Sequence, residues 1–240
     1  MTAPDSDRPP LLARVLDGVR EVLLSPFMLG ILVIGCLVVI DWHQTNHIYP
    51  WYGFLRWNMF LAVVPLVLAY ALAWAARRDW ALFAVPFLAF AWIVFLPNAP
   101  YLISDLVHLQ DGASRANVLT LGLVAVTGLL IGVKCVQIVQ RVIEERFGSR
   151  WGWRAVQAIV VLTTFGVYAG RVLRWNSWNV LSRPHALLAT ALRGPSEPRR
   201  LAFAVVATLV SAVAFYWVYR VLTARQASEL RPAPVPRHRA

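Results

Sequence analysis

Six long apolar runs dominate the chain, and short polar segments separate them. The runs cover residues 27–42, 58–76, 80–97, 117–140, 154–173 and 201–222. Most are near the roughly 17 to 25 residues that a helix needs to cross the hydrocarbon core of a bilayer. Ser25 and Pro26 supply an N-cap and a first-turn proline for the first run. The pattern predicts an all-α polytopic membrane protein, a bundle of six transmembrane helices.

The segment before the first run has the pattern of an amphipathic helix. Between Leu11 and Leu24, leucines and valines fall on one helical face and charged residues on the other. This segment is too charged to cross a bilayer and suits the membrane surface, although an ordinary packing helix fits equally well. We therefore divide the chain into residues 1–26 with this helix, a transmembrane domain over 27–222, and a disordered basic cytoplasmic tail over 223–240.

Composition and charge favour a membrane protein over a nucleic-acid-binding one. Hydrophobic residues make up 59% of the chain and charged residues 15%, whereas soluble domains are nearer half and a quarter. The net charge is +11, but the arginines lie beside the apolar runs, where they set orientation. They are more numerous in the terminal segments and in the second-to-third and fourth-to-fifth connections. The expected partner is therefore the lipid bilayer and not nucleic acid, and both termini are expected in the cytoplasm.

The densest polar stretch follows the third run and reads FLPNAPYLISDLVHL over residues 95–109. Pro97 and Pro100 should break the preceding helix, and Asn98 can cap a new one. We expect a short extracytoplasmic interfacial helix here, and a second one over residues 184–192. The first carries four polar residues at i, i+3, i+4 and i+7: Tyr101, Ser104, Asp105 and His108.

The predicted orientation places three polar connections on the same, extracytoplasmic side, where they can form one composite site. Asp105 and His108 are candidates for acid–base catalysis, with structural pairing to an arginine as the alternative. Arg171 and Arg174 are candidates for binding an anionic group, because guanidinium suits phosphate and carboxylate. If the fifth helix continues, these arginines share one stripe. Six further residues are candidates for substrate binding: Asn98, Tyr101, Arg56, Asn58, Asn176 and Trp178.

The sequence predicts no metal site and identifies no cofactor. Asp41, His43, His47 and His108 are residue types that bind zinc, but nothing in the sequence fixes their separation. We find no Gly-rich phosphate loop, no His-Glu-x-x-His and no paired cysteine motif. The two cysteines lie inside apolar runs and are interpreted as small core residues.

Three strings resemble a known family: FLPNAPYLISDLVHL, LRWN at 55–58 and GRVLRWNSWNVL at 170–181. They are similar to the bacterial membrane proteins grouped as domain of unknown function family 1361, over roughly Trp51 to Leu222. The resemblance implies a multi-pass protein of the bacterial inner membrane and no established activity. That family usually has aspartate after the tryptophan-asparagine-serine-tryptophan stretch, whereas this chain has Asn179, so no acid or metal role is carried to that position.

The functional prediction is a membrane-embedded enzyme or binder that acts on an anionic, possibly lipid-linked group at the extracytoplasmic interface. One alternative is a small-solute transporter, in which the helices containing Pro65 and Pro86 change shape. Another is a non-catalytic subunit that docks through Gly122, Gly128 and Gly132 of the fourth run.

Overall fold

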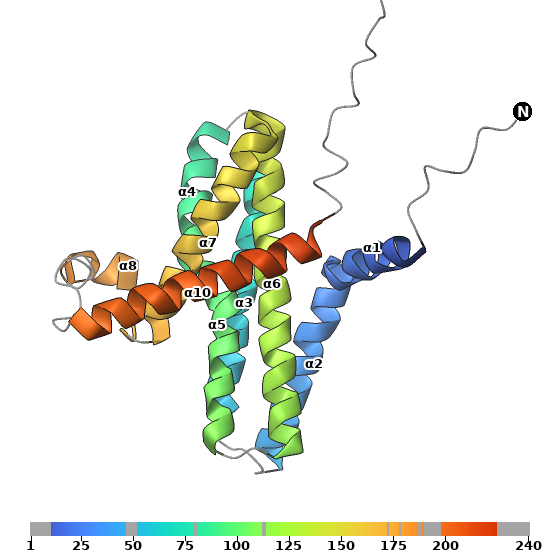
Figure 1. Cartoon of the computed structure of the whole chain (residues 1–240), viewed down its shortest axis with the longest axis vertical. Coiled ribbons are helices and arrows are strands. Elements are labelled where there is room, and N and C mark those ends of the chain that lie inside the picture. Colours follow the sequence, from blue (N-terminus) through green and yellow to red (C-terminus); the bar gives the residue numbers. More distant parts are fainter. Residues whose placement is uncertain are drawn as a thin grey trace, which may run out of the picture.

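The protein is described here from a computed structural model covering residues 11–46, 52–78, 81–111, 114–171, 173–177, 179–186, 189 and 198–224. Its secondary structure over these ranges is entirely helical (Figure 1). The predicted disordered tail lies almost wholly outside them. The helices are α1 (Leu11–Leu23), α2 (Pro26–Thr45), α3 (Gly53–Ala75), α4 (Ala81–Phe95), α5 (Asn98–Tyr101), the 3₁₀ helix η2 (Leu102–Asp111), α6 (Arg115–Phe147), α7 (Ser149–Arg171), α8 (Asn179–Ser182) and α10 (Pro198–Leu222).

Helix α6 forms the centre of the bundle. It packs against α2, α3, η2 and α7, and many of its side chains are buried. Ser114 caps its N-terminus by accepting a hydrogen bond from the backbone N–H of Asn117 at 3.1 Å. Gly148 ends it with φ at 87°, a left-handed conformation that favours glycine.

Helix α2 begins as the sequence predicts. The Ser25 hydroxyl accepts a hydrogen bond from the backbone N–H of Met28 at 3.1 Å, and Pro26 occupies the first turn. Helices α3 and α4 contain Pro65 and Pro86 and continue through both prolines.

Four helical stretches of the described chain are long and apolar enough to cross a membrane. The all-helical membrane architecture is therefore confirmed, but the predicted number of six spans is not. Helix α7 carries Arg150, Arg154 and Gln157 in its first half, which lowers its apolar character. The four stretches are Pro26–Thr45, Gly53–Ala75, Leu82–Gln110 and Arg115–Phe147.

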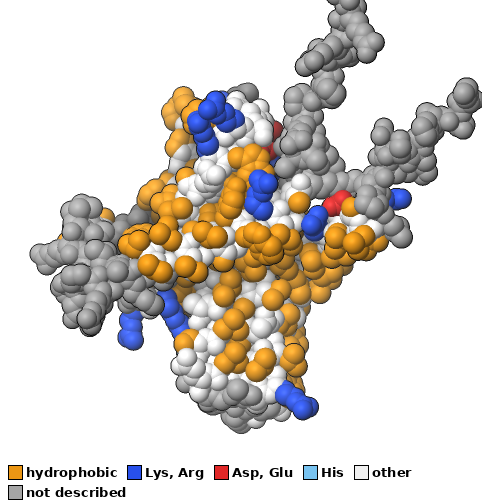
Figure 2. All heavy atoms as spheres, in the orientation of Figure 1, with side chains coloured by type: hydrophobic (Ala, Val, Ile, Leu, Met, Phe, Trp, Pro, Cys, Tyr) orange, Lys and Arg blue, Asp and Glu red, His pale blue; other side chains and the backbone are white. Residues whose placement is uncertain are grey.

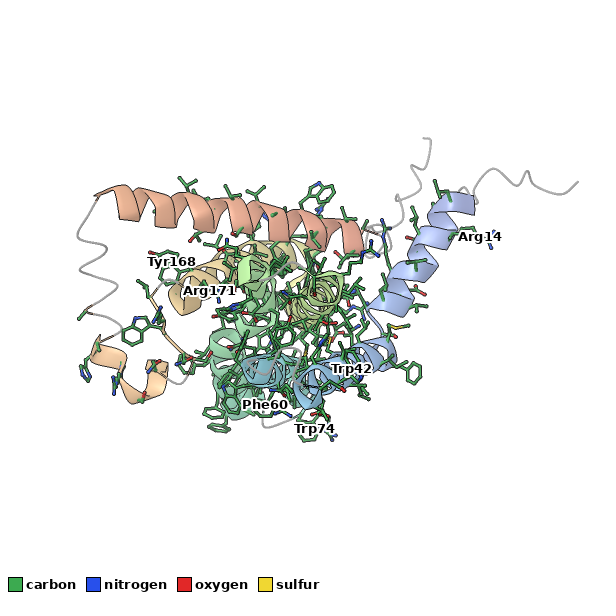
Figure 3. The ribbon with its side chains drawn as sticks, turned by 90° about the horizontal axis from the view of Figure 1, so that it is seen from below. Arg14, Trp42, Phe60, Trp74, Tyr168 and Arg171 are labelled. Carbon is green, nitrogen blue, oxygen red and sulfur yellow. The ribbon has the colours of Figure 1, made fainter. Side chains whose placement is uncertain are left out.

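The last predicted span, α10, runs across the bundle instead of along it (Figures 1 and 3). It packs on α7, and the ring of Phe215 lies against Gly132 of α6. The hydroxyl of Tyr219 donates a hydrogen bond to Oε1 of Gln140. Side chains such as Val213 and Trp217 are exposed, and Figure 2 shows hydrophobic side chains covering this outward face.

The predicted interfacial helix after Phe95 is not confirmed either. Helix α4 ends at Phe95, but the chain turns directly into α5 and η2, which continue downward along α6 (Figure 1). The prolines therefore interrupt the helix without reversing its direction. The second expected interfacial helix, at 184–192, lies partly outside the described residues.

Candidate functional site

The polar stripe after Pro100 lies on a 3₁₀ helix, which changes which residues share a face. With three residues per turn, Leu102, Asp105 and His108 align at i, i+3 and i+6, while Tyr101 and Ser104 lie on a neighbouring face. The α-helical prediction of one common stripe is therefore wrong. Leu102 and Asp105 face the bundle interior, with exposed fractions of 0% and 1%.

Asp105 forms a buried ion pair with α7. Its Oδ1 lies 3.6 Å from Nη1 of Arg171, and its Oδ2 accepts a hydrogen bond from Nδ2 of Asn58 on α3 at 3.1 Å. The Asp105 side chain is 1% exposed and that of Arg171 is 32% exposed. Because an unpaired charge is costly inside an apolar bundle, this pairing holds η2, α3 and α7 together.

Arg171 also contacts the first residue of the predicted stripe. The same Nη1 donates a hydrogen bond to the hydroxyl of Tyr101 at 3.5 Å. The Tyr101 ring packs against Gly170, where an added Cβ would lie 3.3 Å from it. Viewed along the bundle, Arg171 lies at the end of α7, beside the chain that leads to α8 (Figure 3).

A second group of hydrogen bonds ties the segment after α7 to the end of α4. Nδ2 of Asn98 donates to the carbonyl of Phe95 and to Oγ of Ser177, both at 2.8 Å. Oγ of Ser177 donates to the carbonyl of Val94 at 3.0 Å. Asn98 is therefore not the predicted helix cap; Pro97 occupies the N-cap position of α5 without a side-chain hydrogen bond.

A cavity of about 150 Å³ lies between these two groups. Four predicted site residues line it, and each has a polar side chain: Asn58, Asn98, Tyr101 and Asn176. The prediction did not include Ser177, although it lies inside the tryptophan-asparagine-serine-tryptophan string. The complete lining is Trp57, Asn58, Leu61, Val94, Pro97, Asn98, Tyr101, Gly166, Ala169, Gly170, Trp175, Asn176 and Ser177.

The cavity lies within the depth of the bundle. Asn58 is about 8 Å along α3 from its first residue, at 1.5 Å per residue. Residues 173–177, which close one side of the cavity, are not helical. Non-helical backbone at membrane depth occurs where it is buried in protein or lines a cavity, and interrupted helices form binding sites in transporters.

Arg174 does not share a face with Arg171, contrary to the prediction. Helix α7 ends at Arg171, and Arg174 has a φ of 57°, in the left-handed region. The backbone N–H of Trp175 then bonds back to the carbonyl of Ala169 at 3.1 Å, which turns the chain. The Arg174 side chain is exposed.

Five of the predicted site residues are not part of the cavity lining: Arg56, Asp105, His108, Arg171 and Arg174. The ring of His108 packs against Phe54, with centroids 4.9 Å apart. Arg56 forms an exposed ion pair with Asp41 at 3.2 Å. Trp178 and the metal candidate His47 lie outside the described residues. The ranges that the structure describes hold no cluster of three His, Cys, Asp or Glu side chains suited to a metal.

Comparison with known proteins assigns the chain to a family. Residues 57–214 match the family described as Protein of unknown function (DUF1361). The chain belongs to this family. The matched range contains every residue of the cavity lining, and it begins after α1 and α2. No curated protein and no solved structure matches the chain.

Proposed function

We propose that this family member is an integral membrane protein that binds the anionic head group of a lipid or lipid-linked molecule. The binding site is the cavity between α3, α5, α7 and residues 173–177. The observation that carries the proposal is the convergence of Asn58, Asn98 and Tyr101 on one cavity of an apolar bundle, with the exposed Asn176 also in its lining. Polar groups at this depth are costly unless they pair or serve a ligand.

Arg171 supplies the positive charge that an anionic ligand requires. Its contacts to Asp105 and Tyr101 both use Nη1, at 3.6 and 3.5 Å. These distances exceed the roughly 2.7–2.9 Å of a charge-assisted hydrogen bond. Arg171 is not itself part of the cavity lining, so a ligand would reach its remaining guanidinium donors past Tyr101 and Gly170, which do line the cavity.

This geometry favours binding over acid–base catalysis. The Asp105 carboxylate is enclosed by the protein and held by Asn58 and Arg171, so it orients the guanidinium and does not line the cavity. His108 does not line the cavity either. We therefore assign Asp105 a positioning role toward Arg171.

In the proposed orientation, the protein lies in a bacterial inner membrane with the α6–α7 junction and both termini on the cytoplasmic side. Arg141, Arg146, Arg150 and Arg154 lie near the α6–α7 junction, and basic residues are enriched on the cytoplasmic side. Four helices then span the bilayer, and α7 and α10 complete the predicted set of six membrane-embedded helices. In a cysteine-free background, Arg150→Cys should react with an impermeant maleimide only from the cytoplasm. Labelling from outside would reverse the orientation.

The binding proposal is tested with purified full-length protein and a short-chain phosphatidic acid. Asn176→Asp adds a negative charge at an exposed lining position, so phosphatidic acid should bind about tenfold more weakly. Asn176→Gln keeps the amide and is the matched control. Arg183→Gln removes an exposed arginine outside the lining and should leave binding unchanged.

Native mass spectrometry of the bound lipid gives the readout, and circular dichroism checks the fold. Arg171→Gln should also reduce retention of phosphatidic acid. If folded Arg171→Gln and Asn176→Asp proteins both retain as much phosphatidic acid as the wild type, the cavity does not bind an anionic head group.

A further inference from the structure

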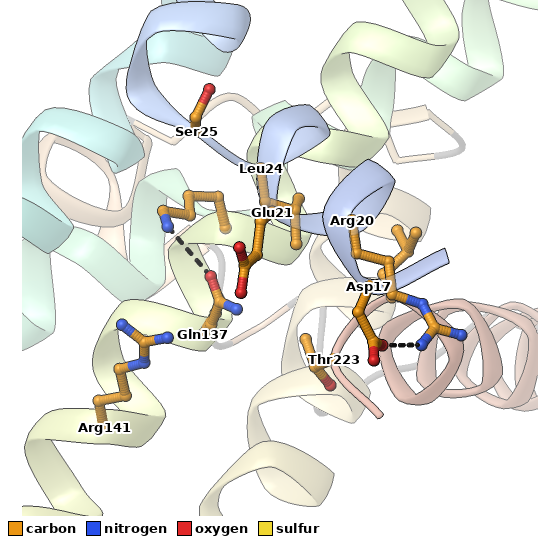
Figure 4. Close-up of a pocket in the computed structure, with 10 residues that line it drawn as sticks. Asp17, Arg20, Glu21, Leu24, Ser25, Gln137, Arg141 and Thr223 are labelled. Atoms are coloured by element: carbon orange, nitrogen blue, oxygen red, sulfur yellow. Dashed lines mark hydrogen bonds and ion pairs between the residues drawn. The ribbon is translucent and has the colours of Figure 1, made fainter. Parts of the chain in front are cut away.

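A second cavity, of about 330 Å³, lies where α1 meets α6 and the end of α10 (Figure 4). It is separate from the cavity described above, and α1, which forms one side, lies outside the range matched to the family. Its lining is rich in charge of both signs. The lining residues are Asp17, Arg20, Glu21, Leu24, Ser25, Lys134, Gln137, Arg141, Leu222 and Thr223.

Two cations from α6 meet in this cavity. Lys134 and Arg141 are seven residues apart and share a helical face. Nζ of Lys134 donates a hydrogen bond to Oε1 of Gln137 at 3.1 Å, and the Arg141 guanidinium extends toward Gln137 in Figure 4. Neither cation forms an ion pair with any residue in the described part of the chain. Together they offer a set of donors for one phosphate group.

The facing helix α1 supplies the opposite charge. Asp17 is already engaged by Arg20, whose Nη1 lies 3.0 Å from its Oδ1. Glu21 also lines the cavity, and its side chain extends from α1 toward Gln137 in Figure 4. Within the described residues its carboxylate has no ion pair. The cavity therefore holds a pair of cations and a carboxylate on opposite walls.

With Arg115 placed at one surface of the bilayer, the cavity lies near the head groups of the opposite surface. Lys134 is about 28 Å along α6 from Arg115, close to the roughly 30 Å thickness of a hydrocarbon core. Helix α1 turns Asp17 into the cavity and exposes apolar side chains, as expected of a helix at the bilayer surface. The exposed apolar side chains of α1 are Leu12, Val15, Leu16, Val19 and Val22.

We propose that this cavity binds the head group of a zwitterionic aminophospholipid of the phosphatidylethanolamine type. Lys134 and Arg141 bind its phosphate, and Glu21 binds its ammonium group. A purely anionic lipid would meet the repulsion of Glu21, and a choline head group cannot donate hydrogen bonds to the carboxylate. The site adds a structural-lipid function that is independent of the ligand in the other cavity.

The test compares three short-chain lipids on the detergent-purified full chain: phosphatidylethanolamine, phosphatidylcholine and phosphatidylglycerol. Native mass spectrometry should show the tightest binding for phosphatidylethanolamine. Glu21→Gln should weaken that binding about tenfold, the effect of losing one charge-assisted hydrogen bond, and remove the preference over phosphatidylcholine. Arg141→Gln should weaken all three lipids, because all carry phosphate.

Two residues near the C-terminal end of α6, outside the cavity lining, provide matched controls. Glu145→Gln removes an acid that pairs with Arg77 at 3.4 Å outside the cavity, and Arg146→Gln removes an exposed arginine of the same helix. Both variants should bind the three lipids as the wild type does. Glu21 is exposed, so Glu21→Gln is expected to leave the fold intact.

Two results would overturn the proposal. Equal binding of phosphatidylethanolamine and phosphatidylcholine, unchanged by Glu21→Gln, would show that Glu21 recognises no ammonium group. Soluble phosphoethanolamine that binds as tightly as the lipid, and competes with it, would show that the ligand is a free phosphate ester and not a lipid. If Glu21→Gln weakens the binding of phosphatidylethanolamine and leaves the binding of phosphatidic acid unchanged, the two lipids bind at different cavities.

Discussion

Replacing either member of the Asp105–Arg171 pair should destabilise the protein, and the two replacements should differ. Arg171→Gln leaves the carboxylate of Asp105 buried at 1% exposure, with one hydrogen bond from Asn58. Loss of one partner from a buried pair typically costs about 3–5 kcal/mol. Asp105→Asn leaves Arg171 unpaired instead, and this side chain is 32% exposed and can reach water or head groups. We expect that variant to lose only about 1–2 kcal/mol.

The double variant Asp105→Asn/Arg171→Gln gives the coupling free energy between the two side chains. Since both single changes break the same contact, their effects should not add, and the coupling free energy should be about 1–3 kcal/mol. Reversible unfolding in mixed detergent micelles, followed by circular dichroism, gives the free energy of unfolding for each variant. Asp41→Asn is the matched control, because it removes the acid of the exposed Asp41–Arg56 pair and should cost less than about 0.5 kcal/mol.

Three results would contradict this prediction. Asp105→Asn could cost as little as Asp41→Asn, or the single effects of Asp105→Asn and Arg171→Gln could add in the double variant. Asp105→Asn could also cost more than Arg171→Gln. Either of the first two results would mean that the ion pair does not form, and the third would mean that the arginine and not the carboxylate is the more enclosed charge.

Three further changes test the packing of α6 and its neighbours. Gly128→Ala should cost about 1–3 kcal/mol, because its Cβ would lie 2.4 Å from a backbone oxygen of the facing segment. The added Cβ of Gly122→Ala meets nothing within 4 Å, so this variant should be neutral or stabilising by up to about 1 kcal/mol. Equal effects of Gly128→Ala and Gly122→Ala on the free energy of unfolding would contradict the close packing at Gly128. Tyr52→Phe removes the hydroxyl that donates to Oδ1 of buried Asn117 and should cost about 1–3 kcal/mol in the same assay, and no loss would exclude that bond. Cys135, at 0% exposure, should react with maleimide only after unfolding, and rapid labelling of folded protein would show that it is accessible.

The positions of most helices could be predicted from local sequence. The Ser25–Pro26 signal starts α2 because the cap and the proline act within one turn, and no distant residue is needed. Asn98 failed as a cap for the opposite reason. Its amide bonds to Ser177, which is far away in the sequence, and this contact exists only after α7 packs beside α4.

The candidate site was predicted in part. Asn58, Asn98, Tyr101 and Asn176 line one cavity, because polar residues beside apolar runs are forced to find one another inside a bundle. Whether Arg171 and Arg174 share a helical face was not predictable, since it depended on whether α7 continued past Arg171. The change from α-helix to 3₁₀ helix at Leu102 likewise altered which residues share a face, although Nη1 of Arg171 contacts both Tyr101 and Asp105.

The sequence by itself determined that this protein is helical and membrane-embedded, and where most of its apolar helices lie. Apolarity and length act locally, because each apolar segment must satisfy its own backbone in a bilayer. Tertiary structure alone decided that α10 crosses the bundle, that Gly128 and not Gly122 makes a close contact, and that Arg171 pairs with Asp105. These outcomes depend on distances of a few ångströms between segments far apart in the chain, where close packing and the cost of an unpaired buried charge select one arrangement.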